Sequence, residues 1–405
     1  MKEMNNYLYD WNENGFSGRK VVIHDETLRE GIQSLSIDIS LDDKIKYLNS
    51  ILQLPVSSIC LGFPASSKMI YDQIDVLIPY VKNRKEDITI SCAARTSISD
   101  MEPIVKLSQK NGCRIKVNAF IGISQIRQYI EQWNVEYICS LVKNVVNYAK
   151  QNGLDICIIT EDSTRTSPEI LKTVYATAIE AGCKNICFCD TVGASDYTGI
   201  RNLFKFINGR IVNGEKGVLV EWHGHNDRGL ALENSILAAL LGANVIHATS
   251  LGIGERCGNT PLELLLLNLA FMGNFKIDSS LKKITEHFRT ITDLFGYQIP
   301  KNYPVWGEDS FSTVSGIHAA AIYKALDMKD NIKEKVYSFI EPSILGRQQK
   351  VLINYMSGKS NILYWLKLNH VHASEKIIAN IMKKAKTSIT PLSDEDIWEI
   401  IKFQK

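Results

Sequence analysis

Residues 218–227 read Val218-Leu219-Val220-Glu221-Trp222-His223-Gly224-His225-Asn226-Asp227, an apolar run that leads directly into polar side chains. The run predicts a short buried strand, and the helical pattern of Leu230–Leu241 then leads to another apolar run, Val245–Ala248. Side chains two apart on a strand share a face, so the imidazoles of His223 and His225 lie side by side. Such a pair can bind a divalent metal, but a bare H-x-H is more often two strand-end histidines bonded to backbone.

The same alternation of an apolar run and a helical pattern recurs along the first 250 residues. The eight runs are Val21–His24, Ser58–Leu61, Ile88–Cys92, Ile115–Phe120, Asp155–Ile159, Asn185–Cys189, Val218–Trp222 and Val245–Ala248. Eight β/α units in order predict either a (β/α)8 barrel or a doubly wound sheet. No G-x-G-x-x-G turn follows the first run, which favours the (β/α)8 TIM barrel.

The pattern changes after Phe295, where prolines and a glycine indicate a linker. Two later stretches, Ser374–Lys386 and Ser393–Lys402, have a helical pattern. We therefore expect an α/β barrel with a smaller, mainly helical appended domain. The expected parts are an N-terminal extension (1–19), the catalytic barrel (20–295), and a linker with C-terminal subdomains (296–405).

Composition excludes several function classes. The 405 residues carry a net charge of +2, and no long basic run is present, so we expect no nucleic-acid partner. No stretch approaches the ~18 apolar residues of a membrane helix, and the polar N-terminus does not resemble a signal peptide. Several of the nine cysteines lie in strand-like runs, as expected for reduced thiols in the cytoplasm.

Catalytic residues of a TIM barrel lie where strands end and the following loops begin. The first and seventh strands of a closed barrel are separated only by the eighth, so Glu30 can approach His223 and His225. Asn259, in the glycine-rich loop after the eighth strand, could add an oxygen ligand. Arg29 could stabilise a developing oxyanion. The alternative for Arg29 and Glu30 is an ordinary surface ion pair.

An ordered set of motifs extends over roughly residues 20–360. It comprises Thr27–Gly31 with Gln33, Gly62–Ser67, Glu161-Asp162, Asp190–Gly193, His223–Asp227, Gly252–Asn259 and Ser315–Ala319. In this order the motifs resemble the 2-isopropylmalate synthase/homocitrate synthase branch of the DRE-TIM metallolyases. The ordered set is far more specific than any single motif.

The resemblance implies an acyltransferase that condenses acetyl-CoA with a 2-oxo acid, releasing a 2-alkylmalate and CoA. It implies that Glu30, His223, His225 and Asn259 hold a divalent cation, for which Zn, Mn, Mg and Co are equally suitable. This cation would chelate the oxo acid. Together with Arg29 it would stabilise the alkoxide formed on attack.

The resemblance also assigns substrate and proton-transfer positions. Gln33, Arg95 and Thr191 match positions that line the oxo-acid site, while Glu161 and His318 match a pair that makes the acetyl-CoA enolate. In this family the histidine reaches the neighbouring subunit's barrel, which implies a homodimer. Each residue also has an ordinary interpretation. Thr191 could cap a helix, Arg95 could pair with Asp100 or Glu102, and His318 could be a capping or core histidine.

Three positions depart from the family pattern. Family members usually carry Glu at the position of Cys60, often His at that of Asn118, and a Tyr near Gln349. We count Cys60 and Asn118 among the substrate-facing residues, so these changes indicate an unusual or apolar acceptor. The chain ends at Lys405 without the leucine-sensing regulatory domain of many isopropylmalate synthases, so leucine inhibition is not expected.

Other functions remain open at this point. A 3-hydroxy-3-methylglutaryl-CoA-type lyase is disfavoured because Cys257 lies one residue too late to match the lyase cysteine. A barrel that has lost activity and only binds a metabolite is a further alternative. Gly62–Ser67 and Gly254–Asn259 resemble isopropylmalate synthase more closely, which implies a 2-oxoisovalerate-like acceptor. Homocitrate synthases place a basic residue for the distal carboxylate of 2-oxoglutarate two strands earlier, and Cys157–Thr160 offers none. Pyruvate or a specialised-metabolite precursor also remains possible.

Overall fold

The protein is described by a computed structural model covering residues 8–9, 11–12, 20–33, 39–85, 87–273, 280–328 and 332–402. Most of the expected N-terminal extension (1–19) therefore lies outside the described residues. Contacts divide the chain into two compact units, Met1–Tyr297 and Gln298–Lys405. Each unit is described by itself.

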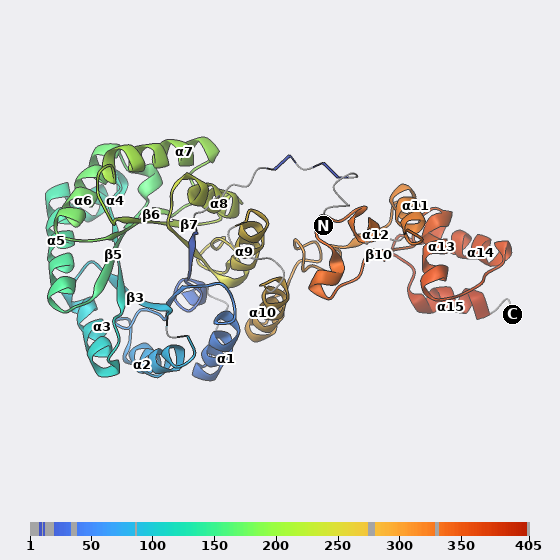
Figure 1. Ribbon diagram of the computed structural model, residues 1–405, viewed down its shortest axis with the longest axis horizontal. Coiled ribbons are helices and arrows are strands. Elements are labelled where there is room, and N and C mark those ends of the chain that lie inside the picture. Colours follow the sequence, from blue (N-terminus) through green and yellow to red (C-terminus); the bar gives the residue numbers. More distant parts are fainter. Residues whose placement is uncertain are drawn as a thin grey trace. The chain divides into compact units, whose positions relative to one another are not determined.

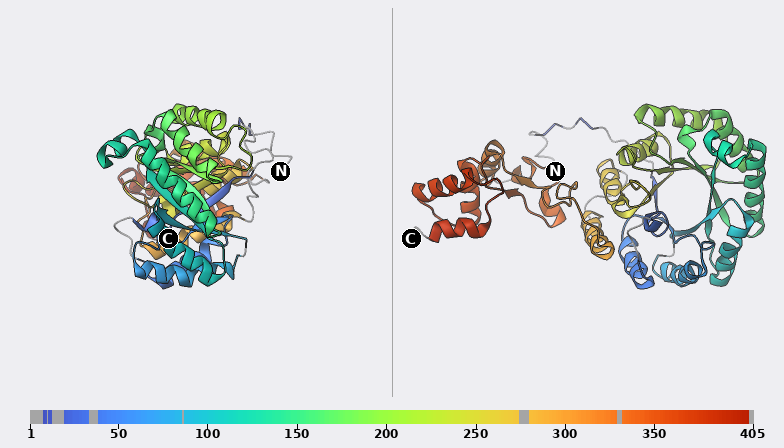
Figure 2. Two further views of the ribbon diagram at one scale, coloured as in Figure 1. Left: turned by 90° about the vertical axis from the view of Figure 1, so that its left-hand side faces the viewer. Right: turned by 180° about the vertical axis from the view of Figure 1, so that it is seen from behind.

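The first unit is a closed barrel of eight parallel strands in sequential order, which confirms the predicted TIM barrel. The strands are β1 (Val22–Asp25), β2 (Ser58–Cys60), β3 (Thr89–Arg95), β4 (Lys116–Gly122), β5 (Asp155–Glu161), β6 (Asn185–Asp190), β7 (Leu219–Gly224) and β8 (Val245–Ala248). Helices surround the strands on the outside (Figure 1 and the right-hand view of Figure 2). The carboxyl ends of all eight strands therefore meet at one face of the barrel.

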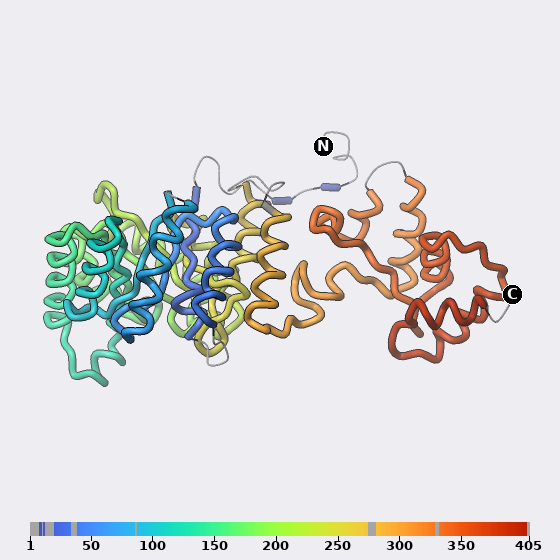
Figure 3. The backbone as a smooth tube through the Cα atoms, turned by 90° about the horizontal axis from the view of Figure 1, so that it is seen from below, coloured from blue at the N-terminus to red at the C-terminus, as the bar shows by residue number. Residues whose placement is uncertain are grey.

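The barrel helices run roughly parallel to one another in the side view of Figure 3. They are α1 (Leu41–Ile51), α2 (Lys68–Lys82), α3 (Ile98–Asn111), α4 (Gln125–Glu131), α5 (Val135–Gln151), α6 (Pro168–Glu180), α7 (Tyr197–Phe206), α8 (Ala231–Leu241), α9 (Leu262–Phe271) and α10 (Ser280–Phe295). Local sequence sets their ends. Ser40 forms a capping box with Asp43 at the start of α1, and Gly112 ends α3 in the left-handed conformation at φ 57°.

The second unit is mainly helical. It contains a two-stranded sheet, β9 (Ser312–Thr313) and β10 (Lys350–Val351), with α11 (Gly316–Ala325), α12 (Ile332–Lys335), α13 (Lys359–Leu368), α14 (Glu375–Lys386) and α15 (Asp394–Lys402). A buried apolar cluster that includes Ile362, Ile381 and Ile397 joins α13, α14 and α15. This cluster gives the unit its own hydrophobic core.

The barrel interior is unusually polar. Lys116 of β4 and Glu221 of β7 form a buried ion pair, with Nζ 2.9 and 3.0 Å from the two carboxylate oxygens. His24 on β1 and His247 on β8 are also buried, and their ring centroids lie 4.5 Å apart. Most TIM barrels fill this space with apolar side chains. Buried charges are retained only where each has a partner.

Two general expectations about the chain can be compared with the structure. All nine cysteines are free thiols. Within the described ranges no helix is both long enough and apolar enough to span a bilayer.

Candidate active site

Strands β1 and β7 each pair with β8, which brings the predicted metal ligands together. Glu30, His223 and His225 offer ligand atoms that all lie within 4.8 Å of one another. The two Nε2 atoms are 3.2 Å apart, and Nε2 of His225 lies 3.7 Å from Oε1 of Glu30. The three side chains are buried. Two imidazoles and a carboxylate leave coordination positions open, as a catalytic metal requires.

The surrounding atoms fit a cation at this point. Among the described residues, neither Nδ1 of His225 nor Oδ1 of Asn259 has a hydrogen-bond partner, although both are buried. The backbones of these two residues pair in an isolated bridge, which brings Asn259 next to the histidines. Burial lowers the pKa of both His223 and His225, so their rings are neutral at pH 7 and can donate a lone pair. The donor set therefore fits a divalent metal.

Arg29 lies between two carboxylates. Its Nε donates to Glu26 Oε2 at 2.8 Å, and its Nη1 donates to Glu30. Burial alone would lower the pKa of Arg29, but the two neighbouring carboxylates outweigh it and raise the pKa. Arg29 is therefore a fixed cation beside the metal ligands.

Glu26 is a site residue that the sequence analysis did not single out. It is fully buried; burial alone would raise its pKa, but Arg29 and His24 hold that pKa well below its usual range. Its Oε1 lies 3.0 Å from Nε2 of His24, and its Oε2 accepts a hydrogen bond from Arg29. The sequence signal for Glu26 was an acidic residue just after the first strand, three positions before Arg29. The motif Thr27–Gly31, which follows directly, drew the interpretation to Arg29 and Glu30 instead.

A cavity of about 200 Å³ opens beside the metal ligands. It brings together seven predicted residues, namely Arg29, Glu30, Gln33, Glu161, Thr191, His223 and His225. One wall is apolar and consists of Phe120, Ile159 and Cys189. The cavity therefore combines cationic, anionic and apolar surfaces in a space suited to a small molecule.

Glu161 ends β5 and faces this cavity. Burial raises its pKa, and Arg127 and Arg29 only partly offset that shift. A carboxyl whose pKa is raised towards neutrality is better suited to proton transfer. Thr191 does not cap a helix, since the cap of α7 is Asp196. Its hydroxyl instead accepts a 2.8 Å hydrogen bond from the Asp162 amide.

Arg256 lines the cavity and is another residue that the predictions missed. It donates to both carboxylate oxygens of Asp227, at 2.8 and 3.2 Å, and to the backbone carbonyl of Thr191. These bonds hold the glycine-rich loop against the loops after β6 and β7. A lone arginine inside that loop was the only sequence signal.

Three predicted substrate residues do not line this cavity. Cys60 and Asn118 are buried in the barrel interior, where Asn118 donates to Ser91 and Glu26. Arg95 has a largely exposed side chain (66%) and forms a two-pronged ion pair with Asp100, one of its two expected alternative partners. Their contact with substrate stays a prediction.

His318 belongs to the second unit, near the start of α11. The residue is exposed, so it is not a core histidine, and its ring lies 4.1 Å from that of Tyr337. Its pairing with Glu161 also stays a prediction.

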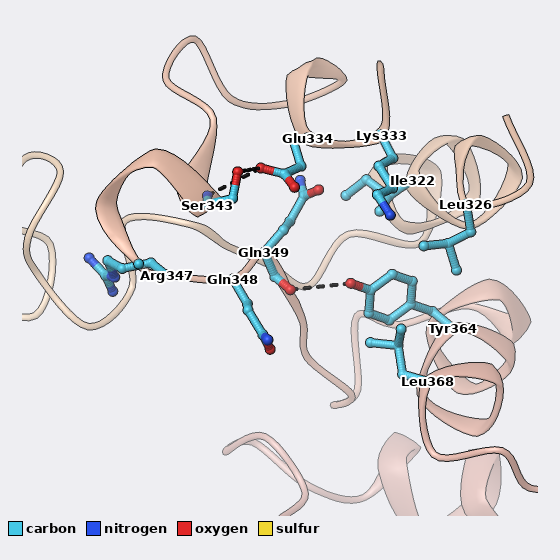
Figure 4. Close-up of a pocket in the computed structure, with 11 residues that line it drawn as sticks. Ile322, Leu326, Lys333, Glu334, Ser343, Arg347, Gln348, Gln349, Tyr364 and Leu368 are labelled. Carbon is cyan, nitrogen blue, oxygen red and sulfur yellow. Dashed lines mark hydrogen bonds between the residues drawn. The ribbon is translucent and has the colours of Figure 1, made fainter. Parts of the chain in front are cut away.

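The second unit has a separate cavity of about 510 Å³ (Figure 4). Gln349 lies in its wall, where its backbone oxygen accepts a 3.2 Å hydrogen bond from Tyr364. Among the described residues, none of the predicted catalytic or metal-binding side chains lines it. The candidate chemistry therefore lies in the smaller barrel cavity.

Comparison with known proteins places this barrel in a family. The HMGL-like family model matches residues 20–291, more than half of the chain. The chain belongs to the HMGL-like family. It is 28% identical to the 2-isopropylmalate synthase of Sulfurisphaera tokodaii, over 91% of each chain. It is also 28% identical to the homocitrate synthase AksA of Methanopyrus kandleri, over 91% of this chain and 87% of the relative.

Solved structures share the barrel fold. The HMG-CoA lyase of Brucella melitensis matches with a TM-score of 0.56 at 17% identity, over 69% of this chain and 100% of that one. At this identity the match shows the barrel fold alone. The predicted resemblance to the 2-isopropylmalate synthase and homocitrate synthase branch is confirmed by the sequence relatives.

Proposed function

We propose that the protein is a metal-dependent acyltransferase that condenses acetyl-CoA with a 2-oxo acid to give a 2-alkylmalate and CoA. One observation carries the proposal. A single small cavity at the carboxyl ends of the strands brings together the carboxylate–imidazole group, Arg29 and Glu161. The names of the sequence relatives support the same reaction class.

The chain's own residues account for acceptor binding. Glu30, His223 and His225, with Asn259, would hold a divalent cation, which when bound polarises the acceptor's keto group as a Lewis acid. Arg29 donates to the keto oxygen and stabilises the negative charge that grows there as the new carbon–carbon bond forms. Gln33 and Thr191 orient the oxo acid from the cavity wall.

Proton transfer makes the nucleophile. Glu161 removes a proton from the acetyl methyl group, and the resulting enolate carbon attacks the keto carbon. His318, supplied by the appended unit of a neighbouring subunit, assists this transfer in a homodimer. Water then cleaves the thioester, which releases CoA and the alkylmalate.

The apolar wall favours an acceptor with a branched apolar side chain. Phe120, Ile159 and Cys189 can pack against such a group, but they offer no charge for a second carboxylate. In a CoA-release assay with acetyl-CoA and a divalent metal, we expect 2-oxoisovalerate to outperform 2-oxoglutarate by at least about tenfold in kcat/KM, roughly 1.4 kcal/mol.

Each other result of that panel has a definite meaning. Preference for 2-oxoglutarate would indicate a homocitrate-type enzyme, and preference for pyruvate would indicate a citramalate-type enzyme. Intact metal binding without CoA release from any acceptor would contradict catalysis and favour a metabolite-binding barrel.

Replacing Arg29 by lysine tests the proposed oxyanion contact. Lysine keeps one charge but lacks the planar fork that holds Glu26 and Glu30 together. We expect Arg29→Lys to lower kcat by about 10²–10³ with a smaller change in KM for the oxo acid. Steady-state kinetics of both substrates measures this.

The matched control is Arg114→Lys. Arg114 is an exposed arginine of the same barrel that pairs with Asp155. Its activity should stay near that of the unmodified enzyme. An Arg29→Lys enzyme with unchanged kcat would exclude the proposed role of the guanidinium.

A further inference from the structure

A second group of metal-ligating side chains lies in the barrel interior, apart from the candidate active site. His24 of β1, Glu26 just after β1, and His247 of β8 offer ligand atoms within 4.8 Å of one another. His24 Nε2 lies 3.0 Å, and His247 Nδ1 3.6 Å, from the same Glu26 oxygen, Oε1. All three residues are at most 2% exposed.

The separations match those of a coordination sphere. Tetrahedral zinc with bonds of about 2.0–2.1 Å holds its ligand atoms roughly 3.3 Å apart. The Asn118 amide lies at the same spacing, where a fourth ligand would be. Its nitrogen is 3.2 Å from His24 Nε2 and 3.3 Å from Glu26 Oε1. A half-turn of that amide would place its oxygen, which has no partner among the described residues, at this position.

In both histidines, the ring nitrogen that faces away from Glu26 already forms a hydrogen bond. His247 donates from Nε2 to Glu221 at 2.8 Å, and Lys116 in turn holds Glu221. His24 Nδ1 bonds to Ser58 Oγ at 2.6 Å. Metal-bound histidines characteristically bond their other nitrogen to a carboxylate or a similar group, which fixes the tautomer. His247 therefore presents the lone pair of Nδ1 to Glu26, and His24 presents that of Nε2 in the tautomer that carries its proton on Nδ1.

The charges and lone pairs around Glu26 also favour a bound cation. His247 Nδ1 has no hydrogen-bond partner among the described residues, yet it faces the Glu26 carboxylate. Two groups that both present lone pairs repel each other unless a cation or a shared proton lies between them. Among the described residues, the permanent cations paired with the buried carboxylates Glu26, Glu30 and Glu221 are Arg29 and Lys116.

We propose that His24, Glu26, His247 and Asn118 form a second, structural site for a divalent transition-metal cation of the zinc class. Four nearly fully buried ligands at this spacing suit tetrahedral zinc or cobalt better than magnesium, which keeps several bound waters. Because the ligands are almost fully buried, the ion binds as the barrel folds and does not exchange afterwards. The ion fixes Glu26 Oε1, and so steadies Glu26 Oε2 against Arg29.

Elemental analysis of the purified full-length protein tests this site. After dialysis against a strong chelator, we expect about one zinc ion per chain to remain, and the same in a His223→Ala/His225→Ala variant. Adding His247→Gln to that variant should release the ion to the chelator, because glutamine can still bond Glu221 but leaves His24 as the one imidazole ligand of the site. His287→Gln is the control, since His287 is an equally buried histidine held by Ser50 and Ser250.

Two outcomes would overturn the proposal. One is that the protein holds no ion after it has been stripped of metal in the unfolded state and refolded in excess zinc. The other is an ion that persists in the His247→Gln variant. If that variant does not fold, anomalous diffraction of the unmodified protein decides, because the site requires a peak between His24 and His247. Ion content is measured without turnover, so this test does not depend on the proposed function.

Discussion

Replacing both His223 and His225 by alanine is expected to abolish CoA release, lowering kcat by at least about three orders of magnitude. The change removes both imidazoles and leaves the Glu30 carboxylate and the Asn259 amide as the remaining proposed ligands. One carboxylate and one amide oxygen cannot retain a divalent ion against bulk water. Isothermal titration of chelated protein with Mn²⁺ or Zn²⁺ should therefore show that binding at this exchangeable site is lost.

Folding is expected to survive this change. Both histidines line the cavity, and among the described residues their Nε2 atoms bond chiefly to one another. Far-ultraviolet circular dichroism should match the unmodified protein. The control His372→Ala removes an exposed histidine of the second unit and should change neither binding nor turnover. A double variant that still turns over at the original rate would contradict the assigned ligands.

The fold could be predicted because each strand carries its own signal. All eight apolar runs became barrel strands, with ends shifted by a few residues. The run Ile115–Phe120, for example, is β4, Lys116–Gly122. A parallel strand enclosed on both faces reads as a continuous apolar run, and that pattern is local. The closure of β1 onto β8 then followed from the order of the units alone.

The candidate site was predicted less completely, because a strand's own sequence does not show how deep in the barrel a side chain lies. His223 and Asn118 both lie on barrel strands, yet His223 reaches the cavity while Asn118 bonds to groups below it. The partners of Asn118 are 27 to 94 residues away in the chain. Glu26 was missed for the same reason, since its partners come from both neighbouring and distant strands.

The interior ion pair gives the largest expected effect on stability. Lys116→Met would leave Glu221 charged and buried, with His247 as its remaining hydrogen-bond partner. Burial opposes the charge on both groups. Glu221 nevertheless raises the pKa of Lys116, and Lys116 lowers the pKa of Glu221, so both side chains stay ionised. Breaking such a pair from one side costs about 3–5 kcal/mol of unfolding free energy. Urea unfolding followed by tryptophan fluorescence measures this loss, because Trp222 is fully buried in the barrel.

A second substitution distinguishes the effect of the broken ion pair on stability from the effect of the lost lysine packing. Adding Glu221→Gln to Lys116→Met removes the unpaired charge and keeps a hydrogen-bonding group for His247, so most of the lost stability should return. The exposed pair Arg114–Asp155 is the matched comparison, and Arg114→Met should cost no more than about 1 kcal/mol. If the single and double variants were equally unstable, the loss would come from the lysine's packing. The charge balance inside this barrel would then not limit its stability.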